Sequence, residues 1–166
     1  MDLWQMLLRG LQFIWVLLIT ALIGNVIALN HSGHMVSINF AMFVAVLSWL
    51  AVIYGLVASI VEAVMIPIVL FVLDGLATLF TFIAAIVLSA KLGAPNCSHP
   101  HKSTAWIGWG ASDTEKRCRE LQASTAFMWF LWATFVATLV LALMSFRRVG
   151  GSARTSGPGM SQVGRV

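Results

Sequence analysis

Charged residues are scarce in this chain, because Lys, Arg, Asp and Glu together make up only 10% of its 166 residues. A soluble domain carries about 25%. Hydrophobic residues make up 60% of the chain, and its mean hydropathy is +0.92. A chain with so few charges cannot cover an aqueous surface, so lipid must cover much of it. The composition therefore predicts an integral membrane protein.

Motifs for catalysis and for nucleic-acid binding are also missing. The sequence has no glycine-rich phosphate loop, no GxSxG motif and no stripe of alternating basic and aromatic residues. A metal site needs three or four ligands in a set geometry, whereas the histidines form two pairs in separate loops, His31 with His34 and His99 with His101. We therefore expect no enzyme activity, no cofactor, no metal site and no nucleic-acid partner.

Four long apolar runs determine the predicted fold. An α-helix needs about 20 apolar residues to cross roughly 30 Å of hydrocarbon. The runs that reach this length are residues 10–30, 40–61, 67–90 and 123–146. Strands of a membrane barrel would alternate and would be about ten residues long, so these runs predict helices. The expected fold class is all-α, with a four-helix transmembrane bundle over 1–146 and a disordered tail over 147–166.

Two local signals refine the helix starts. Pro67 fits the first turn of the third helix, where its missing N–H costs nothing. Ser112-Asp113-Thr114-Glu115 resembles a capping box, in which the serine and the glutamate bind the first free N–H groups of a helix. The fourth helix is therefore expected to begin near Asp113, outside the hydrocarbon.

The orientation follows from the basic residues and the loops. An even number of spans places both termini on one side. The count of basic residues is tied, with five on the terminal side and five in the long loop. Arg147 and Arg148 break the tie, because they directly follow a span, where the positive-inside rule is strongest. Glycosylation sequons at Asn30 and Asn96 fall in loops on the other face. We expect cytoplasmic termini and an exoplasmic loop over residues 91–122.

Both cysteines, Cys97 and Cys118, lie in this loop and neither lies in a span. Two interpretations remain open at this point. The cysteines form a loop disulfide, which requires an oxidising compartment, or they are two free thiols.

Asp74 is the one ionisable residue that the predicted spans place deep in lipid. A central aspartate costs roughly 2.5–3.5 kcal/mol on insertion scales. It is either a helix-packing residue or a site for a proton, a cation or a lipid headgroup, and we favour packing. Glu62 ends the second span, where it is a solvated acid or a partner of Arg9.

Small residues recur every four positions along the second span. Such a face lets another helix approach closely. Packing within the bundle is the simpler interpretation, and the alternative is self-association into a homo-oligomer or capture of a partner in the membrane. The face consists of Ala51, Gly55, Ser59 and Ala63.

Several stretches together resemble a known family. They are NFAMF at residues 39–43, PIVLFVLD at 67–74, RCRELQA at 117–123 and SQV at 161–163. The pattern resembles the fungal non-classical export protein 2 family, a branch of the MARVEL-domain tetraspan membrane proteins. The resemblance implies a plasma-membrane organiser of microdomains that is associated with the eisosome, responds to sphingolipid and is linked to non-classical protein export. It also implies a disulfide between Cys97 and Cys118, and a role for Asp74 in bundle structure or lipid response.

Two functional hypotheses follow. The leading one is a non-enzymatic plasma-membrane scaffold whose partners are membrane lipids, among them sphingolipid or sterol, and eisosome or other membrane proteins. Lateral assembly would then shift with lipid composition, because one assembly state binds the lipid better. The alternative is a small transporter or channel that uses Asp74.

Overall fold

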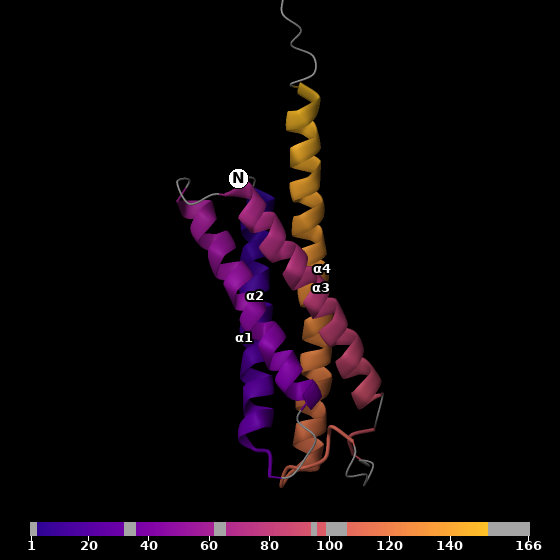
Figure 1. Ribbon diagram of the computed structural model, residues 1–166. Helices are drawn as coiled ribbons and strands as arrows, with labels where there is room; N and C mark the ends of the chain where they lie inside the picture. The colour runs from indigo at the N-terminus through magenta and orange to yellow at the C-terminus, as the bar shows by residue number, and fades with distance from the viewer. Residues whose placement is uncertain (1–2, 32–35, 62–65, 94–95, 99–105, 153–166) are drawn as a thin grey trace, which may run out of the picture.

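The computed structural model describes residues 3–31, 36–61, 66–93, 96–98 and 106–152. Over these residues the chain forms long α-helices joined by short connections and one longer loop (Figure 1). The helices are α1 (Leu3–Ala28), α2 (Val36–Ile60), α3 (Pro67–Leu92) and α4 (Thr114–Ser152).

Each helix is long and apolar enough to cross a membrane. Large apolar side chains face outward on every helix, including Trp4 at 71% exposed, Leu50 at 57% and Phe130 at 54%. Side chains of this kind would be unfavourable in water over so much surface, and lipid covers them instead. The structure thus confirms the predicted all-α fold of four membrane-spanning helices.

The helices form a closed ring in cross-section. Helix α1 packs on α2 and α4, and α3 packs on the same two neighbours. The diagonal pairs α1–α3 and α2–α4 have no close backbone contacts within the described ranges. We call the end with Leu3, Ile60 and Pro67 the terminal end, and the end with Ala28 and Thr114 the loop end (Figure 1).

The buried positions of each helix follow alternating steps of three and four residues. This 3.5-residue period lets one narrow face stay against its neighbours along a left-handed bundle. In α1 the buried residues are Arg9, Gln12, Val16, Ile19, Ile23 and Val26. In α3 the series runs through Asp74, Ala77, Thr81, Ala84 and Leu88. Polar residues therefore occupy core positions at the terminal end of both helices.

Several helix bounds differ from the predicted spans. Helix α1 begins at Leu3 rather than at residue 10, which places Arg9 inside the helix. Helix α4 runs through Ser152, whereas a disordered tail was expected from residue 147. A prediction from hydropathy places the end of a span at a charged residue. The backbone hydrogen bonds of the helix, however, continue through charged residues without a break. Residues 153–166 of the predicted tail lie outside the described residues.

The start of α4 agrees with the prediction, but the capping residue differs. The Lys116 backbone N–H donates to Asp113 Oδ1 at 3.0 Å. Asp113, rather than Ser112, therefore caps the helix. At the other end α4 extends past the other helices (Figure 1).

Candidate functional site

A buried ion pair crosses the diagonal of the bundle near its terminal end. Arg9 Nη1 donates to Asp74 Oδ1 at 2.8 Å, and Nη2 donates to Oδ2 at 2.5 Å. Both side chains are only 3% exposed. Two parallel hydrogen bonds between a guanidinium and a carboxylate fix both groups in one plane. The pair is the direct link between α1 and α3, whose backbones do not approach each other closely.

Polar side chains extend this link to α4. Arg9 Nη1 also donates to Gln12 Oε1 at 3.0 Å, one turn further along α1. Gln12 Nε2 donates to Thr138 Oγ1 of α4 at 3.2 Å, and the Thr138 hydroxyl donates to the Phe135 carbonyl at 2.9 Å. Each polar group in the series therefore has a partner inside the bundle, as buried polar groups require.

Helix α2 contributes the space for the guanidinium. A Cβ atom added to Gly55 would lie 2.5 Å from Arg9 Nε and 2.6 Å from Arg9 Cζ. No real Cβ approaches that closely, so the missing side chain of Gly55 is what lets the arginine cross the bundle. All four helices thus meet at Arg9: α1 supplies it, α2 makes room for it, and α3 and α4 bind it directly or through Gln12.

The energetics favour a fixed pair over a mobile one. An isolated charge in the hydrocarbon is costly, and breaking a buried pair by removing one partner typically costs about 3–5 kcal/mol. The Arg9 and Asp74 side chains are almost fully enclosed. The pair therefore makes the arrangement of α1 and α3 specific, because any shift of one helix would leave a charge unpaired.

One prediction about ionisable residues is wrong. Asp74 was expected to be the only ionisable residue deep in a span, but Arg9 lies beside it at 2% exposed. Arg9 was also considered as a partner for Glu62, and the contact that the structure shows for its guanidinium is with Asp74. Glu62 itself lies outside the described residues. The signal that could have placed Arg9 was its position in the 3-4 series of α1, in register with Gln12 and Val16.

The predicted small-residue face of α2 is only partly an inward face. Ala51 and Gly55 are buried, whereas Ser59 is half-buried and its hydroxyl donates to the Leu56 carbonyl of its own helix. Ala58 is buried beside it, because the inward face follows steps of three and four rather than steps of four. Ala63 lies outside the described residues.

The loop end is closed by a different set of contacts. Cys97 and Cys118 form a disulfide that joins the loop to the second turn of α4, with their Cα atoms 5.7 Å apart. Trp106 Nε1 donates to the Leu92 carbonyl at 3.1 Å, and so covers the end of α3. The His31 backbone N–H donates to the Gly110 carbonyl at 2.7 Å. The loop is therefore tied to three of the helices.

Arg117 is the polar centre of this end. Its Nε donates to the Ile107 carbonyl at 3.0 Å, and Nη1 donates to Asn30 Oδ1 at 2.7 Å. Beside it, Asn25 Nδ2 donates to Glu120 Oε1 at 2.6 Å. The side chain of one predicted sequon, Asn30, is thus used inside the fold. The other sequon residue, Asn96, is exposed and accepts from the Ser98 backbone N–H at 3.2 Å.

Most of the histidine pairs lie outside the described residues. His31 is exposed, and His34, His99 and His101 lie outside the described residues. Within the described parts of the chain, no group of three or more His, Cys, Asp or Glu side chains could hold a metal ion.

Comparisons with known proteins agree with this architecture. The model of the MARVEL family, a membrane-associating domain, matches residues 2–141. Non-classical export protein 2 of Saccharomyces cerevisiae is 30% identical over 153 residues, which cover 91% of this chain and 85% of that protein. Non-classical export protein 102 of Candida albicans is 35% identical over 168 residues, which cover 96% and 97%. No solved structure matches the chain significantly.

These matches span all four helices, and they confirm the resemblance that residues 67–74 and 117–123 indicated. The first of those segments carries Asp74 of the ion pair, and the second carries Arg117 and Cys118 of the loop end. The chain therefore belongs to the MARVEL family, as a multi-pass membrane protein related to the fungal non-classical export proteins.

Proposed function

We propose that the protein is a non-enzymatic organiser of lipid and protein domains in the plasma membrane, with both termini in the cytoplasm. One observation carries the proposal. The buried polar groups at the terminal end bind one another across the bundle, while large apolar side chains face lipid on every helix. Lipid and protein partners can therefore contact the side chains of the outer surface and of the loop.

The outer surface supports lateral contacts with lipid. Phe82 of α3 packs against Trp129 and Trp132 of α4, with centroids 6.0 and 5.2 Å away, and Phe82 and Trp129 are partly exposed on the outer surface. Helix length biases the thickness of the surrounding bilayer. A domain of matching lipids would then collect around the bundle.

The finer parts of the proposal come from the family. We propose that the protein resides in eisosome-associated microdomains, that its assembly responds to sphingolipid, and that it contributes to non-classical protein export. The names of the two fungal relatives, both non-classical export proteins, support the link to export. Its proposed partners are sphingolipid or sterol, eisosome proteins and further copies of itself.

A transporter or channel that uses Asp74 is the second candidate. The observation in its favour is the buried base, because an acid with a buried base is a common arrangement in proton relays. Against it, both carboxylate oxygens are bound by a guanidinium that does not release its proton. The candidates separate in proteoliposomes, where a transporter gives a flux that Asp74→Asn abolishes and a scaffold gives none.

Imaging tests the leading proposal. The full chain carries a fluorescent tag at its C-terminus and is viewed in fungal plasma membrane before and after depletion of sphingolipid. We expect static clusters that disperse on depletion. A uniform distribution under both conditions would contradict the proposal. Protease applied to intact cells tests the orientation, because cleavage within residues 147–166 would place the C-terminus outside.

A further inference from the structure

A small cavity lies against the ion pair at the terminal end of the bundle. Three helices line it, and each contributes two residues that are four positions apart. These residues are Gln5 and Arg9 of α1, Leu70 and Asp74 of α3, and Thr138 and Ala142 of α4. Residues with this spacing lie one above the other on the same face of a helix. The cavity therefore lies between an inner layer, which holds the ion pair, and an outer layer one turn nearer the terminal end.

The size and the polarity of this cavity suit a single water molecule. Its volume is about 10 Å³. A water needs roughly 10–15 Å³ and two to four polar partners. Gln5, Arg9, Asp74 and Thr138 supply polar groups in its lining. A lipid headgroup or a hydrated ion is much larger than this volume, so neither fits.

The hydrogen-bonding groups around the cavity are only partly used. Gln5 is half-buried, and its side-chain amide has no hydrogen bond among the described residues. Arg9 makes three hydrogen bonds, to Gln12 and to both oxygens of Asp74, whereas a guanidinium carries five N–H groups. Each carboxylate oxygen has a second lone pair. Buried polar groups of this kind are satisfied by the protein or by ordered water.

The bundle core closes the cavity off on the side of the loop end. Val16, Ile19 and Phe135 lie in that direction, and all are fully buried. On the other side, Gln5 lies only two residues from Leu3, where α1 begins. This separation is about 3 Å along the helix axis. Water therefore has a short path to the cavity from the terminal end, and packed apolar side chains block the path from the loop end.

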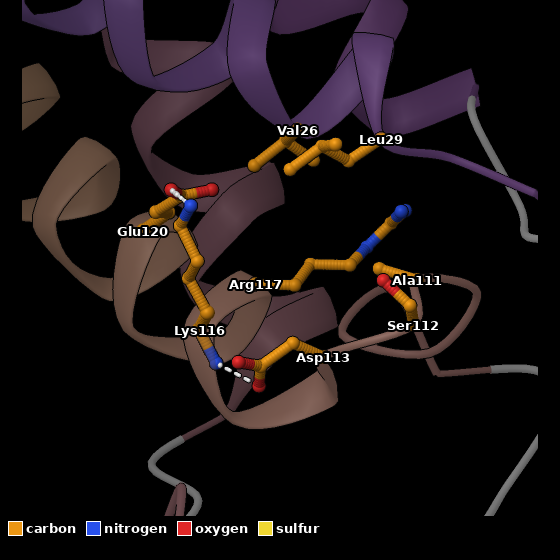
Figure 2. A pocket seen from close by; sticks show the side chains of 8 residues that line it. All are labelled: Val26, Leu29, Ala111, Ser112, Asp113, Lys116, Arg117 and Glu120. Atoms are coloured by element: carbon orange, nitrogen blue, oxygen red, sulfur yellow. Dashed lines mark hydrogen bonds and ion pairs between the residues drawn. The ribbon is translucent and has the colours of Figure 1, made fainter.

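A second cavity, at the loop end, has a different relation to solvent (Figure 2). Figure 2 shows Lys116 beside Glu120 and Asp113, which it contacts through Nζ at 4.0 Å and through its backbone N–H at 3.0 Å. Asp113 and Lys116 are exposed, so bulk water already hydrates them. The side chains of Arg9 and Asp74 are only 3% exposed. They can be hydrated only by a water that is bound inside the bundle.

We propose that the cavity at the terminal end binds one water molecule, which bridges the Gln5 amide to the Asp74 carboxylate and hydrates the ion pair from this end only. A bridging water is nearly as favourable in enthalpy as a direct hydrogen bond. The water adds a second link between α1 and α3, one turn outside the contact of Arg9 with Asp74. This inference goes beyond the proposed function and does not depend on whether the protein organises membrane domains.

Hydration from one end distinguishes this site from a conducting pathway. A channel or a proton relay needs water or exchangeable groups on both sides of the ion pair. Gln12 lies on the inner side of Arg9, where its Oε1 accepts from Arg9 and its Nε2 donates to Thr138. Its amide is therefore held by the protein, and the proposal predicts that no water reaches it.

The two glutamines of α1 are matched probes for the water. The full chain, isotopically labelled at its glutamine side chains, is purified in uncharged detergent, and NMR records cross-peaks between water and the side-chain amide protons. A water that stays bound while the protein tumbles gives cross-peaks of opposite sign in NOESY and ROESY spectra, whereas proton exchange gives the same sign in both. We expect bound-water cross-peaks for Gln5 and none for Gln12. The loss of signals in Gln5→Leu assigns them.

Cavity-filling variants locate the water. Ala142→Val places a larger side chain in the cavity and should abolish the bound-water cross-peaks of Gln5. Leu143→Val places the same residue at the next position of α4, which is 43% exposed on the outer surface, and should leave them unchanged. Leu70→Phe fills the cavity from α3 and replaces Ala142→Val if that variant folds poorly. Tryptophan fluorescence reports whether each variant is folded.

The possible results separate clearly. Cross-peaks at Gln5 that disappear in a folded cavity-filling variant and remain in Leu143→Val support the proposal. It is overturned if Gln5 shows no bound-water cross-peaks, or if they persist in both cavity-filling variants. Bound-water cross-peaks at Gln12 as well as at Gln5 also overturn it, because water would then pass the ion pair.

Discussion

The two ends of the bundle each bury an arginine, and they satisfy it differently. Arg9, inside the membrane span of α1, is bound by both oxygens of Asp74. Arg117, in the polar first turn of α4, is bound by a carbonyl and an amide oxygen. Hydrocarbon offers no outside partner, so the protein must neutralise the charge there itself. At headgroup depth, water or a lipid can supply what the protein leaves out.

The links that close each end also differ. At the terminal end, an ion pair joins residues 65 positions apart in the sequence. At the loop end, a disulfide joins residues 21 positions apart. The first link depends on how α1 and α3 are placed, whereas the second restrains only the loop and the start of α4. Substitutions should therefore disturb the whole bundle at one end and the loop alone at the other.

The largest effect is expected from breaking the ion pair. Asp74→Leu leaves Arg9 as an unpaired buried charge and should lower the free energy of unfolding by about 3–5 kcal/mol. The double variant Arg9→Met, Asp74→Leu replaces both charges by apolar groups and should recover most of that loss. Unfolding in detergent, followed by tryptophan fluorescence, measures both. If the double variant is no more stable than Asp74→Leu alone, the pair is not coupled as described.

Removal of the disulfide should have the next largest effect. Cys97→Ser with Cys118→Ser frees a loop of about 20 residues and should cost about 3 kcal/mol. Because α1–α3 contacts lie at the other end, hydrogen exchange should rise in the loop and the start of α4 but not around Asp74. Reduction of the unmodified protein provides the control, since it should reproduce the variant. Increased exchange throughout α3 would show that the two ends are not independent.

Gly55→Ala tests the space for Arg9 with the addition of a single methyl group. Overpacking of this kind costs about 1–3 kcal/mol, and the Cβ would lie 2.5 Å from Arg9 Nε. Gly75→Ala, on α3 next to Asp74, is the matched control because its added Cβ meets nothing within 4 Å. That control should be neutral or stabilising by up to about 1 kcal/mol. Equal destabilisation by both substitutions would mean that the contact with Arg9 is not the cause.

The smallest effect is expected from the surface pair at the loop end. Arg119 Nη2 donates to Glu115 Oε1 at 2.5 Å, and both side chains are largely exposed. Glu115→Gln should cost only about 0.3–0.5 kcal/mol, and the loss should vanish in high salt. Midpoints measured at low and high ionic strength test this. A loss above about 1 kcal/mol would show that this pair contributes more than the comparison of the two ends allows.

The fold could be predicted from hydropathy because lipid imposes one simple requirement on each span. Residues 40–61 and 67–90 have no local alternative to a membrane helix, and the structure places α2 and α3 there. The ends were less predictable. Arg9 stops a hydropathy window, although the helix continues for six residues on its N-terminal side. A charged side chain such as Arg9 therefore does not mark the residue at which the helix begins.

The site was only partly visible in the sequence. Asp74 stood out, because an acid in lipid is rare. Its partner did not, because a contact across 65 residues depends on how the helices are arranged around the ring. Gly55 was recognised as a small residue. A glycine is needed there because the Arg9 side chain occupies the space of a Cβ atom, and not because two helices approach closely. Arg117 looked like one more loop cation, since nothing local in the sequence reports its burial.

The separation of Arg9 and Asp74 along the chain also has a consequence for biosynthesis. A chain made from its N-terminus brings Arg9 to the membrane well before α3 has been synthesised. Until then the guanidinium lacks Asp74, and the first helix is stable only if its arginine stays near the headgroups. The final depth of α1 is therefore set late, when α3 arrives. A nascent chain that stops at Ile60 should leave Arg9 accessible to water.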